Sequence, residues 1–304
     1  MRVILNPMAR GGAGRRLRGE IERALIDRHG GFQIVETAHS GHGVDLAAGA
    51  VHDGVSTIVA AGGDGTIHEV ANGVLNALDD APRDVAFGII PIGTGNDFAK
   101  VVPGARSLSD ALQTLNDGHP RPFDVGVAEW AGNREYFLNA MGTGVDVEVV
   151  RQIQRMERGN FVYLRGLMRA LALYSPVQLR IQADDTDISA RVMLVAVANG
   201  TCVGGSFRIA PRAVTDDGRL DLCIVSEMPR LAQLAIVPRI IAGSHESHPR
   251  VFHARVESVT LSAVGGIPLF FQLDGELREP ADVRQVRVTI QRARLQIIAA
   301  PGHA

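Results

Sequence analysis

The chain of 304 residues has almost no lysine, because 30 of its 31 basic residues are arginine and only Lys100 remains. A Walker-type phosphate loop needs Gly-Lys followed by Ser or Thr, whereas Lys100 lies in the sequence Phe-Ala-Lys-Val. That class of nucleotide site is therefore excluded. A lysine Schiff base is excluded as well, unless Lys100 itself supplies it.

Cysteine, long apolar runs and excess positive charge are also scarce. Cys202 and Cys223 are the only cysteines, too few for a disulfide framework or a thiolate zinc site, so we expect reduced, buried thiols in a cytoplasmic protein. No apolar run approaches the roughly 18 residues of a transmembrane helix, so any membrane role is expected to be peripheral. The formal net charge of -2 gives no basic field that favours nucleic acid as a partner.

Glycine is abundant instead, with 34 residues, of which 23 precede residue 151. The content of 46% hydrophobic and 21% charged residues is typical of a soluble globular protein. At roughly 150 residues per domain, the length predicts two domains. We place them at residues 1–125 and 126–304, and we leave open whether the final strand returns to the first domain.

The first 125 residues alternate between short apolar runs and segments with helical spacing of apolar residues. The expected strands are Val3–Leu5, Phe32–Val35, Val55–Ala61 and Val85–Pro91. The expected helices are Leu17–Leu25, Gly43–Val51, Ile67–Leu78 and a segment that begins after Ser107. Such repetition predicts an open parallel α/β sheet that binds ligands at the carboxyl ends of its strands.

The remainder of the chain is dominated by short β-like runs, which predict a mainly antiparallel domain. These runs are Phe123–Ala128, Tyr136–Ala140, Val177–Ala183, Ala190–Ala198, Leu220–Val225, Ser258–Ser262, Leu269–Leu273 and Val283–Ile290. Two helical stretches interrupt them, at about 147–174 and 231–242. In the first, five arginines form a stripe roughly 80° wide if the helix is continuous across Gly159-Asn160. We interpret the stripe either as a surface for anionic lipid or as an ordinary solvated face; the arginines are Arg151, Arg155, Arg158, Arg165 and Arg169.

The segment Gly62-Gly63-Asp64-Gly65-Thr66 lies between an expected buried strand and a helix. Glycines allow a phosphate to approach the backbone, and the helix N-terminus offers free N–H groups to an anion. Asp64 would repel a phosphate unless a divalent cation lay between them, so we interpret it as a metal-linked carboxylate. The alternative is a glycine-rich turn in which Asp64 caps the helix.

Two further glycine-rich segments end neighbouring strands of the expected sheet. In Gly93-Thr94-Gly95-Asn96-Asp97, the threonine is placed to donate to a phosphate and Asn96 and Asp97 to hold a metal, although a simple helix cap stays open. In residues 6–14, Arg10 or Arg15 can supply positive charge in place of lysine. All three segments are expected at one edge of the sheet.

These three segments, in this order and spacing, resemble the diacylglycerol kinase catalytic domain superfamily, which includes bacterial soluble diacylglycerol kinases and sphingosine and ceramide kinases. The second half of the chain agrees in five further motifs. They are Phe123-Asp124-Val125-Gly126, Leu138 to Asp146, Ala198-Asn199-Gly200 followed by Gly204-Gly205-Ser206, Asp216 to Asp221, and Leu273-Asp274-Gly275-Glu276.

The resemblance implies an N-terminal NAD-kinase-like open parallel α/β domain that binds ATP and Mg²⁺, and a C-terminal, mainly antiparallel β-sandwich domain for the lipid. It implies transfer of the γ-phosphate to a lipid hydroxyl, with diacylglycerol giving phosphatidic acid as the first expectation. An NAD-kinase-like small-molecule kinase and a nucleotide-binding regulator without activity are the alternatives. The implied setting is cytoplasmic and peripheral to the inner face of the membrane, with no nucleic acid partner, and a homodimer is left open.

The resemblance also implies particular site residues. Asp274 is favoured as the base, with Glu276 as the competitor, and Asp124 joins Asp64 and Asp97 in a magnesium-linked network. A structural cation is implied at Asp217 with the carbonyl groups of Val214 and Arg219; the alternative is a plain β-turn. The implied nucleotide-binding residues are Asn6, Arg10, Gly11, Gly12, Gly14, Thr37, Gly62, Gly63, Asp64, Gly65, Thr66, Glu69, Thr94, Asn96 and Asp97.

Overall fold

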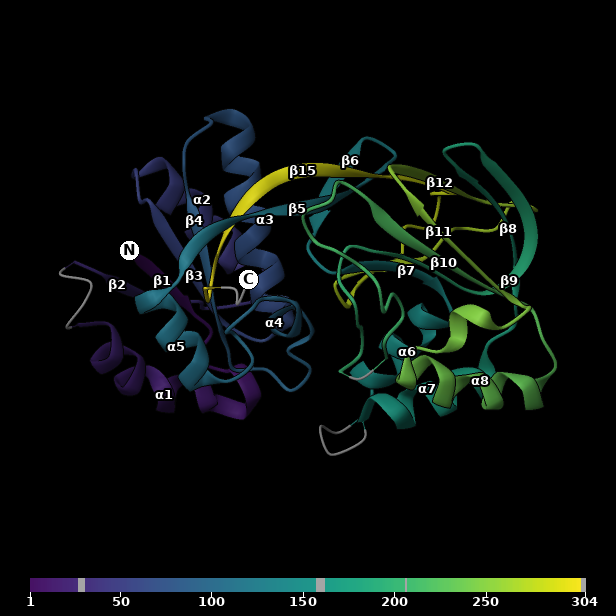
Figure 1. Ribbon diagram of the computed structural model, residues 1–304, viewed down its shortest axis with the longest axis horizontal. Helices are drawn as coiled ribbons and strands as arrows, with labels where there is room; N and C mark the ends of the chain where they lie inside the picture. Colours follow the sequence, from purple (N-terminus) through teal and green to yellow (C-terminus); the bar gives the residue numbers. More distant parts are fainter. Residues whose placement is uncertain (27–30, 157–161, 206, 302–304) are drawn as a thin grey trace. The chain divides into compact units, whose positions relative to one another are not determined.

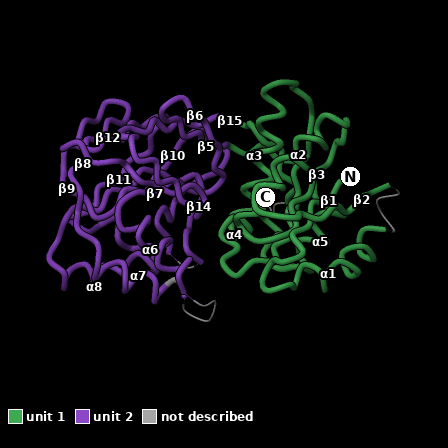
Figure 2. Tube along the Cα trace, turned by 180° about the vertical axis from the view of Figure 1, so that it is seen from behind, with its two compact units in different colours: residues 1–124, 293–304 green, residues 125–292 purple. Residues whose placement is uncertain are grey.

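The computed structural model describes residues 1–26, 31–156, 162–205 and 207–301 (Figure 1). The chain divides into two compact units (Figure 2). Unit 1 comprises Met1–Asp124 and Ala293–Ala304, and unit 2 comprises Val125–Arg292. The end of the chain therefore groups with the N-terminal unit.

Unit 1 is built on a parallel sheet with the strand order β15-β4-β3-β1-β2, in agreement with the expected open α/β sheet. Each strand is a short apolar run, and the central ones are buried on both faces, as parallel strands covered by helices must be. The strands are β1 (Arg2–Leu5), β2 (Gln33–Glu36), β3 (Thr57–Gly62), β4 (Ala86–Pro91) and the last part of β15 (Gln285–Ala299).

Helices cover both faces of this sheet. Helices α1 (Ala9–Ile26) and α5 (Leu108–Asp117) share one apolar core with alternate residues of the strands, such as Val3 and Leu5. Helices α2 (His42–His52) and α3 (Asp64–Asp80) pack together on the other face (Figure 1). The short helix α4 (Asp97–Val101) follows β4.

Unit 2 is antiparallel in every pairing recorded among its described strands, in agreement with the sequence prediction. The order β14-β13-β7-β9-β8-β12-β15 is extended by β10 and β11 beside β9 and by the β5–β6 hairpin. The strands are β5 (His119–Trp130), β6 (Asn133–Phe137), β7 (Ala140–Gly144), β8 (Val177–Ala183), β9 (Thr186–Ala198), β10 (Leu220–Ser226), β11 (Val251–Val256), β12 (Ser258–Ala263), β13 (Phe271–Leu273) and β14 (Glu276–Arg278).

Two apolar clusters organise unit 2. One is shared among the strands themselves, and the other lies between β9, β10 and three helices. These helices are α6 (Val145–Gln154), α7 (Val162–Leu173) and α8 (Arg230–Ala242), with the 3-10 helix η1 (His245–Ser247) after α8. Both cysteines are free and buried, as expected, and burial raises the pKa of the Cys223 thiol to about 12.

The expected helical stretch over 147–174 consists of two helices, because α6 ends at Gln154 and α7 begins at Val162. The arginine stripe is therefore not carried by one helix. Arg151 pairs instead with Glu148 and Glu279, and Arg158 lies outside the described residues.

A buried ion pair joins β10 to β11 and gives a testable pH dependence. The His253 Nε2 atom lies 3.1 Å from the Asp221 Oδ1 atom, and the interaction with that carboxylate raises the pKa of His253. The stabilisation is fully present below the unfolded-state pKa of about 6.5 and is lost as pH rises through the folded-state pKa. We expect His253→Gln to reduce the free energy of unfolding more at pH 6 than at pH 8.5, measured by urea denaturation. An equal reduction at both pH values would contradict the pairing.

Candidate functional site

The three glycine-rich segments are neighbours at one edge of the unit 1 sheet. The first loop (residues 6–14) follows β1, the second loop (62–66) follows β3 and the third loop (93–97) follows β4. Strand β3 pairs with β1 on one side and β4 on the other, all in parallel. The carboxyl ends of parallel strands are where α/β sheets bind their ligands.

The first loop has a backbone that ordinary helical residues do not adopt. Arg10, Gly11 and Gly12 have φ values of 47°, 66° and 85°, which interrupt the beginning of α1. A Cβ atom at Gly14 would lie 2.0 Å from the Asn6 carbonyl oxygen, so only glycine fits at this crossing. The loop thus folds tightly over the end of β1 and leaves the Arg10 side chain exposed.

Direct contacts connect the three loops. The Asn6 Nδ2 atom donates to the Thr66 Oγ1 atom at 3.0 Å, and the Phe98 amide, just after the third loop, donates to the Asp64 Oδ1 atom at 3.2 Å. A Cβ atom at Gly93 would lie 2.7 Å from the Gly63 Cα atom, so the second and third loops touch backbone to backbone. The loops therefore form one preformed constellation.

The second loop ends at the N-terminus of α3, whose 17 residues make it one of the longer helices. Its N-cap residue is Gly63, which has no side chain that could cap the helix. The first amides of a helix have no partner within the helix, and its dipole adds partial positive charge there. These amides can therefore bind an anion such as a phosphate.

Oxygen donors stand around the same edge. The Asn96 Oδ1 atom is buried and has no hydrogen-bond partner within the described part of the chain, and Asn96 itself has a φ of 49°. Asp97 pairs with Lys100 at 2.8 Å, so the single lysine is bound to a site carboxylate. Asp64, Asp97 and the unsatisfied Asn96 oxygen are the type of ligand that Mg²⁺ prefers.

Within the described residues, no group of three or more His, Cys, Asp or Glu side chains could hold a metal by itself. Mg²⁺ does not need such a group, because it usually takes one or two carboxylates together with substrate phosphates and water. The donor set thus fits a magnesium ion that arrives with a nucleotide.

Two residues expected to contact nucleotide, Glu69 and Thr37, have hydrogen-bond partners within the fold. The Glu69 carboxylate accepts hydrogen bonds from the amides of Gly41 and Gly43, at 2.8 and 3.1 Å, and thereby holds the beginning of α2. The amide of Thr37, just after β2, donates to the Leu5 carbonyl oxygen at the end of β1. Thr94, in contrast, is exposed in the third loop.

Asp124 is 1% exposed and lies in unit 1 at the point where β5 leaves it. Its Oδ1 atom accepts a hydrogen bond of 2.7 Å from the Ala293 amide, at a residue with a φ of 49°. Asp124 therefore fixes the bend of β15 where that strand enters unit 1. The resemblance implies a place for Asp124 in the magnesium-linked network; its contact with the Ala293 amide is not predictable from the sequence.

Asp274 and Gly275 form the tight turn between β13 and β14, with φ values of 50° and 90°. Positive φ at both central residues is the requirement of a type I′ hairpin turn, which Asp-Gly satisfies. The Asp274 carboxylate accepts hydrogen bonds from three successive amides, those of residues 138, 139 and 140, at 2.8, 2.8 and 3.0 Å. It therefore joins the turn to the beginning of β7.

Glu276 begins β14 two residues later, and its side chain is half-buried. It makes no hydrogen bond within the described residues, although its charge acts on Arg278. Of the two carboxylates in the Asp-Gly-Glu motif, one is thus held by the backbone and the other is available.

Buried amide side chains of Gln272, Asn139 and Asn199 stabilise the turn at Asp274 and Gly275. The Gln272 Oε1 atom accepts from the Gly275 amide at 2.6 Å, and its Nε2 atom donates to Asp146 at 2.7 Å. Asn139 and Asn199, both nearly fully buried, donate to carbonyl groups of Cys202 and Leu138. Such a connected network fixes the position of the turn.

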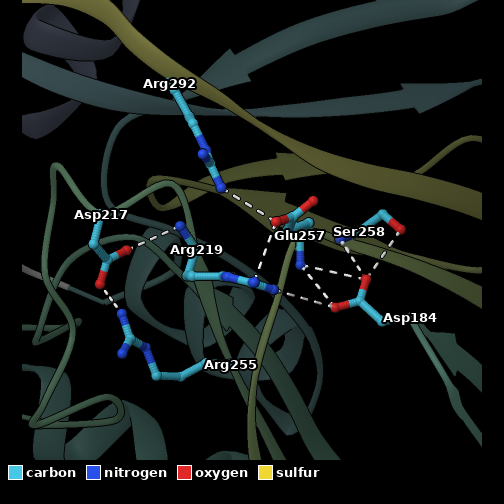
Figure 3. A network of polar contacts seen from close by, with 7 residues as sticks. All are labelled: Asp184, Asp217, Arg219, Arg255, Glu257, Ser258 and Arg292. Atoms are coloured by element: carbon cyan, nitrogen blue, oxygen red, sulfur yellow. Dashed lines mark hydrogen bonds and ion pairs between the residues drawn. The ribbon is translucent and has the colours of Figure 1, made fainter.

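The implied structural cation at Asp217 does not fit the contacts found there (Figure 3). The Asp217 Oδ2 atom is ion-paired with the guanidinium of Arg255, and its Oδ1 atom accepts from the Arg219 amide at 2.9 Å. Both carboxylate oxygens are engaged, and positive charge is already supplied by the protein.

Replacing Asp217 by asparagine is therefore expected to lower stability equally with and without divalent cations. The pair is partly exposed, so we expect a cost of about 0.5–1 kcal/mol in the free energy of unfolding. Urea denaturation of both proteins in EDTA and in MgCl₂ measures it. A cost that vanishes in EDTA would instead identify Asp217 as a cation ligand.

No helix among the described residues is long and apolar enough to cross a bilayer.

Two family models match the chain. Residues 1–128 match a model described as the diacylglycerol kinase catalytic domain, and residues 139–299 match the YegS C-terminal NAD kinase beta sandwich-like domain.

Relatives of this chain are named as YegS-like lipid kinases or as diacylglycerol kinases. A protein of Xanthomonas oryzae named "Probable lipid kinase YegS-like" is 31% identical over 82% of this chain and 80% of its own length. A diacylglycerol kinase of Staphylococcus aureus is 28% identical over 90% of this chain and 85% of its own length. A crystal structure of a diacylglycerol kinase from Bacillus anthracis superposes with a TM-score of 0.75 at 22% identity, covering 99% of this chain and 96% of that one, and so supports the fold.

Proposed function

The chain belongs to the family of diacylglycerol kinases and YegS-like lipid kinases, and from this premise we propose that it transfers the γ-phosphate of ATP to the hydroxyl group of diacylglycerol, giving phosphatidic acid. Family membership makes it a lipid kinase, a phosphotransferase with an alcohol acceptor. The observation that carries the proposal is the joining of the three glycine-rich loops at one sheet edge.

The nucleotide phosphates are held by backbone amides in this proposal. The uncapped N-terminus of α3 and the glycines beside it supply N–H groups, and Arg10 supplies the mobile positive charge that a Walker lysine supplies elsewhere. Lys100 forms an ion pair with Asp97, so it partly neutralises that carboxylate and is not assigned to the phosphates.

Asp64, Asp97 and the Asn96 Oδ1 atom would hold Mg²⁺ at this edge. When bound, Mg²⁺ would supply positive charge against the phosphates. Asp64 is already fixed by the Phe98 amide, and Asp97 by Lys100, so both carboxylates are oriented before any ligand binds. Such preorganisation lowers the reorganisation that the transfer step requires.

The contacts in unit 2 favour Glu276 as the base that takes the proton of the acceptor hydroxyl. Asp274, the residue that sequence reasoning preferred, has three amide donors on its carboxylate and holds the hairpin turn. A general base needs a free lone pair within hydrogen-bond reach of the hydroxyl. Glu276 has this freedom, and the turn fixed by Asp274 positions it.

The lipid acceptor implies work at the inner face of the cytoplasmic membrane, with unit 2 taking the lipid and the enzyme attached only peripherally. Both cysteines are free and buried, which is consistent with a protein that works in a reducing compartment.

An acceptor panel tests the proposal. The purified protein is given γ-labelled ATP, MgCl₂ and, separately, diacylglycerol, a sphingoid base, ceramide, phosphatidylglycerol or NAD, with the lipids in mixed micelles. We expect label in phosphatidic acid. Label in another lipid alone would replace diacylglycerol as the acceptor, label in NAD alone would overturn the lipid assignment, and no labelled product with any acceptor would favour a regulator.

A further inference from the structure

Helices α7 and α8 of unit 2 expose an unusual number of apolar side chains. Leu231 is 82% exposed and Leu173 is 65% exposed. Together the two helices hold half of the exposed large apolar side chains that the described residues contain. We call this set the α7–α8 face: Leu164, Met168, Leu173, Leu231, Leu234 and Ile241.

The two helices adjoin each other. The Arg230 Nη1 atom, at the beginning of α8, donates to the Leu171 and Ala172 carbonyl oxygens at the end of α7, at 3.1 and 2.9 Å. Their inner sides share one apolar core, and both figures of the whole chain draw α7 and α8 at the same end of unit 2. Leu173 and Leu231 follow these bonded residues directly, so these two exposed leucines lie close together where the helices meet.

The charge of this surface is of one sign. Helices α7 and α8 contain four arginines and neither Asp nor Glu, although the whole chain has a net charge of -2. On α7, Arg165 and Arg169 are one turn apart and lie next to Leu164 and Met168, which are also one turn apart. All four arginines are exposed: Arg165, Arg169, Arg230 and Arg239.

Exposed leucines bordered by arginines, without acidic residues, have the composition of a helix face that lies in a membrane interface. The leucines can enter the boundary between head groups and acyl chains, and guanidinium groups bind phosphate oxygens in pairs. Several large apolar side chains exposed on two neighbouring helices mark an interaction surface.

A second copy of the chain is a poorer occupant. In a two-fold interface each patch faces itself, so the arginines of one copy would face those of the other. Neither helix offers an acidic residue to offset this repulsion. An anionic bilayer offers both the apolar layer and the opposite charge.

We propose that the α7–α8 face docks unit 2 onto the surface of an anionic lipid bilayer. The inference deepens the proposed function and rests on it, since a lipid kinase must take its acceptor from such a surface. The face is distinct from the arginine stripe expected from sequence, because only Arg165 and Arg169 of that stripe border it and because it includes the leucines of α8.

Vesicle co-sedimentation of the full chain tests the docking without ATP or acceptor. We compare vesicles of phosphatidylcholine with vesicles that also contain phosphatidylglycerol. Leu173→Ser combined with Leu231→Ser is expected to lower the partition coefficient at least about tenfold. Arg165→Gln combined with Arg169→Gln is expected to lower it by about thirtyfold on anionic vesicles and to weaken its salt dependence.

Ile26→Ser is the matched control, because Ile26 is 62% exposed but lies on α1 of unit 1. It is expected to bind vesicles as the unaltered chain does. All four residues of the test variants have exposed side chains, and unfolding curves show that each variant is folded.

Binding that is unchanged in both double variants overturns the docking proposal. The proposal is also overturned if the leucine variant changes only self-association, measured by sedimentation velocity. That result would assign the face to a second copy of the chain. The kinase assay is a separate test. If the variants lose vesicle binding but the unaltered chain phosphorylates no acceptor, the docking surface is supported and the proposed function is rejected.

Discussion

Glu276→Gln is expected to lower kcat by about 10²–10⁴-fold, the usual contribution of a positioned general base. The amide keeps the size of the side chain but cannot accept the hydroxyl proton. Because Glu276 makes no hydrogen bond among the described residues, the free energy of unfolding should hardly change. Steady-state kinetics with ATP and lipid micelles, together with urea denaturation, measure both effects.

Asp274→Asn is the matched companion, two residues away in the same turn. An amide group cannot accept all three hydrogen bonds from residues 138–140, so we expect a loss of about 1–3 kcal/mol in stability. Its kcat should fall only as far as the turn loosens. A stable but inactive Asp274→Asn protein beside an active Glu276→Gln protein would give the base role to Asp274.

Asp64→Asn is expected to reduce kcat/KM for ATP by about 10²–10³-fold, similar to the loss of one preorganised electrostatic group. Asparagine keeps an oxygen that can accept from the Phe98 amide, so the link between the second and third loops remains. What disappears is the negative charge that faces Mg²⁺. The reduction should become smaller as MgCl₂ is raised, which initial-rate measurements at several concentrations can follow.

Asp79→Asn serves as the control for Asp64, because both residues lie on α3, at opposite ends of the helix. Asp79 pairs with Arg294, and loss of a partly exposed pair costs about 1 kcal/mol or less. Its kinetic constants should equal those of the unaltered chain. If Asp64→Asn behaved in the same way, Asp64 would have only a structural role.

The parallel sheet and its three loops could be predicted because their signals are local. Buried apolar runs end at Gly62 and Gly93, and helical spacing resumes at once. In a parallel sheet this order alone brings the loops to one edge. The tight crossing of Gly14 over Asn6 could not be foreseen, because it depends on a carbonyl position rather than on residue pattern.

Contacts between distant residues were beyond sequence reasoning. The Asp274 carboxylate accepts hydrogen bonds from amides more than 130 positions earlier in the chain, and no local pattern near Asp274 indicates these partners. Arg255 faces Asp217 only because β10 and β11 pair in a particular register. The division of the 147–174 stretch, in contrast, had a local signal in Gly159-Asn160, although α6 ends earlier, at Gln154.

The most direct test of a lipid kinase is the stoichiometry of transfer. ADP and phosphorylated lipid are measured together, by coupled assay and mass spectrometry, for the unaltered chain and for Glu276→Gln with diacylglycerol present or absent. We predict one phosphatidic acid for each ADP, ADP formation that requires the lipid, and neither product in quantity from the variant. ADP released without a phosphorylated lipid would contradict the assignment.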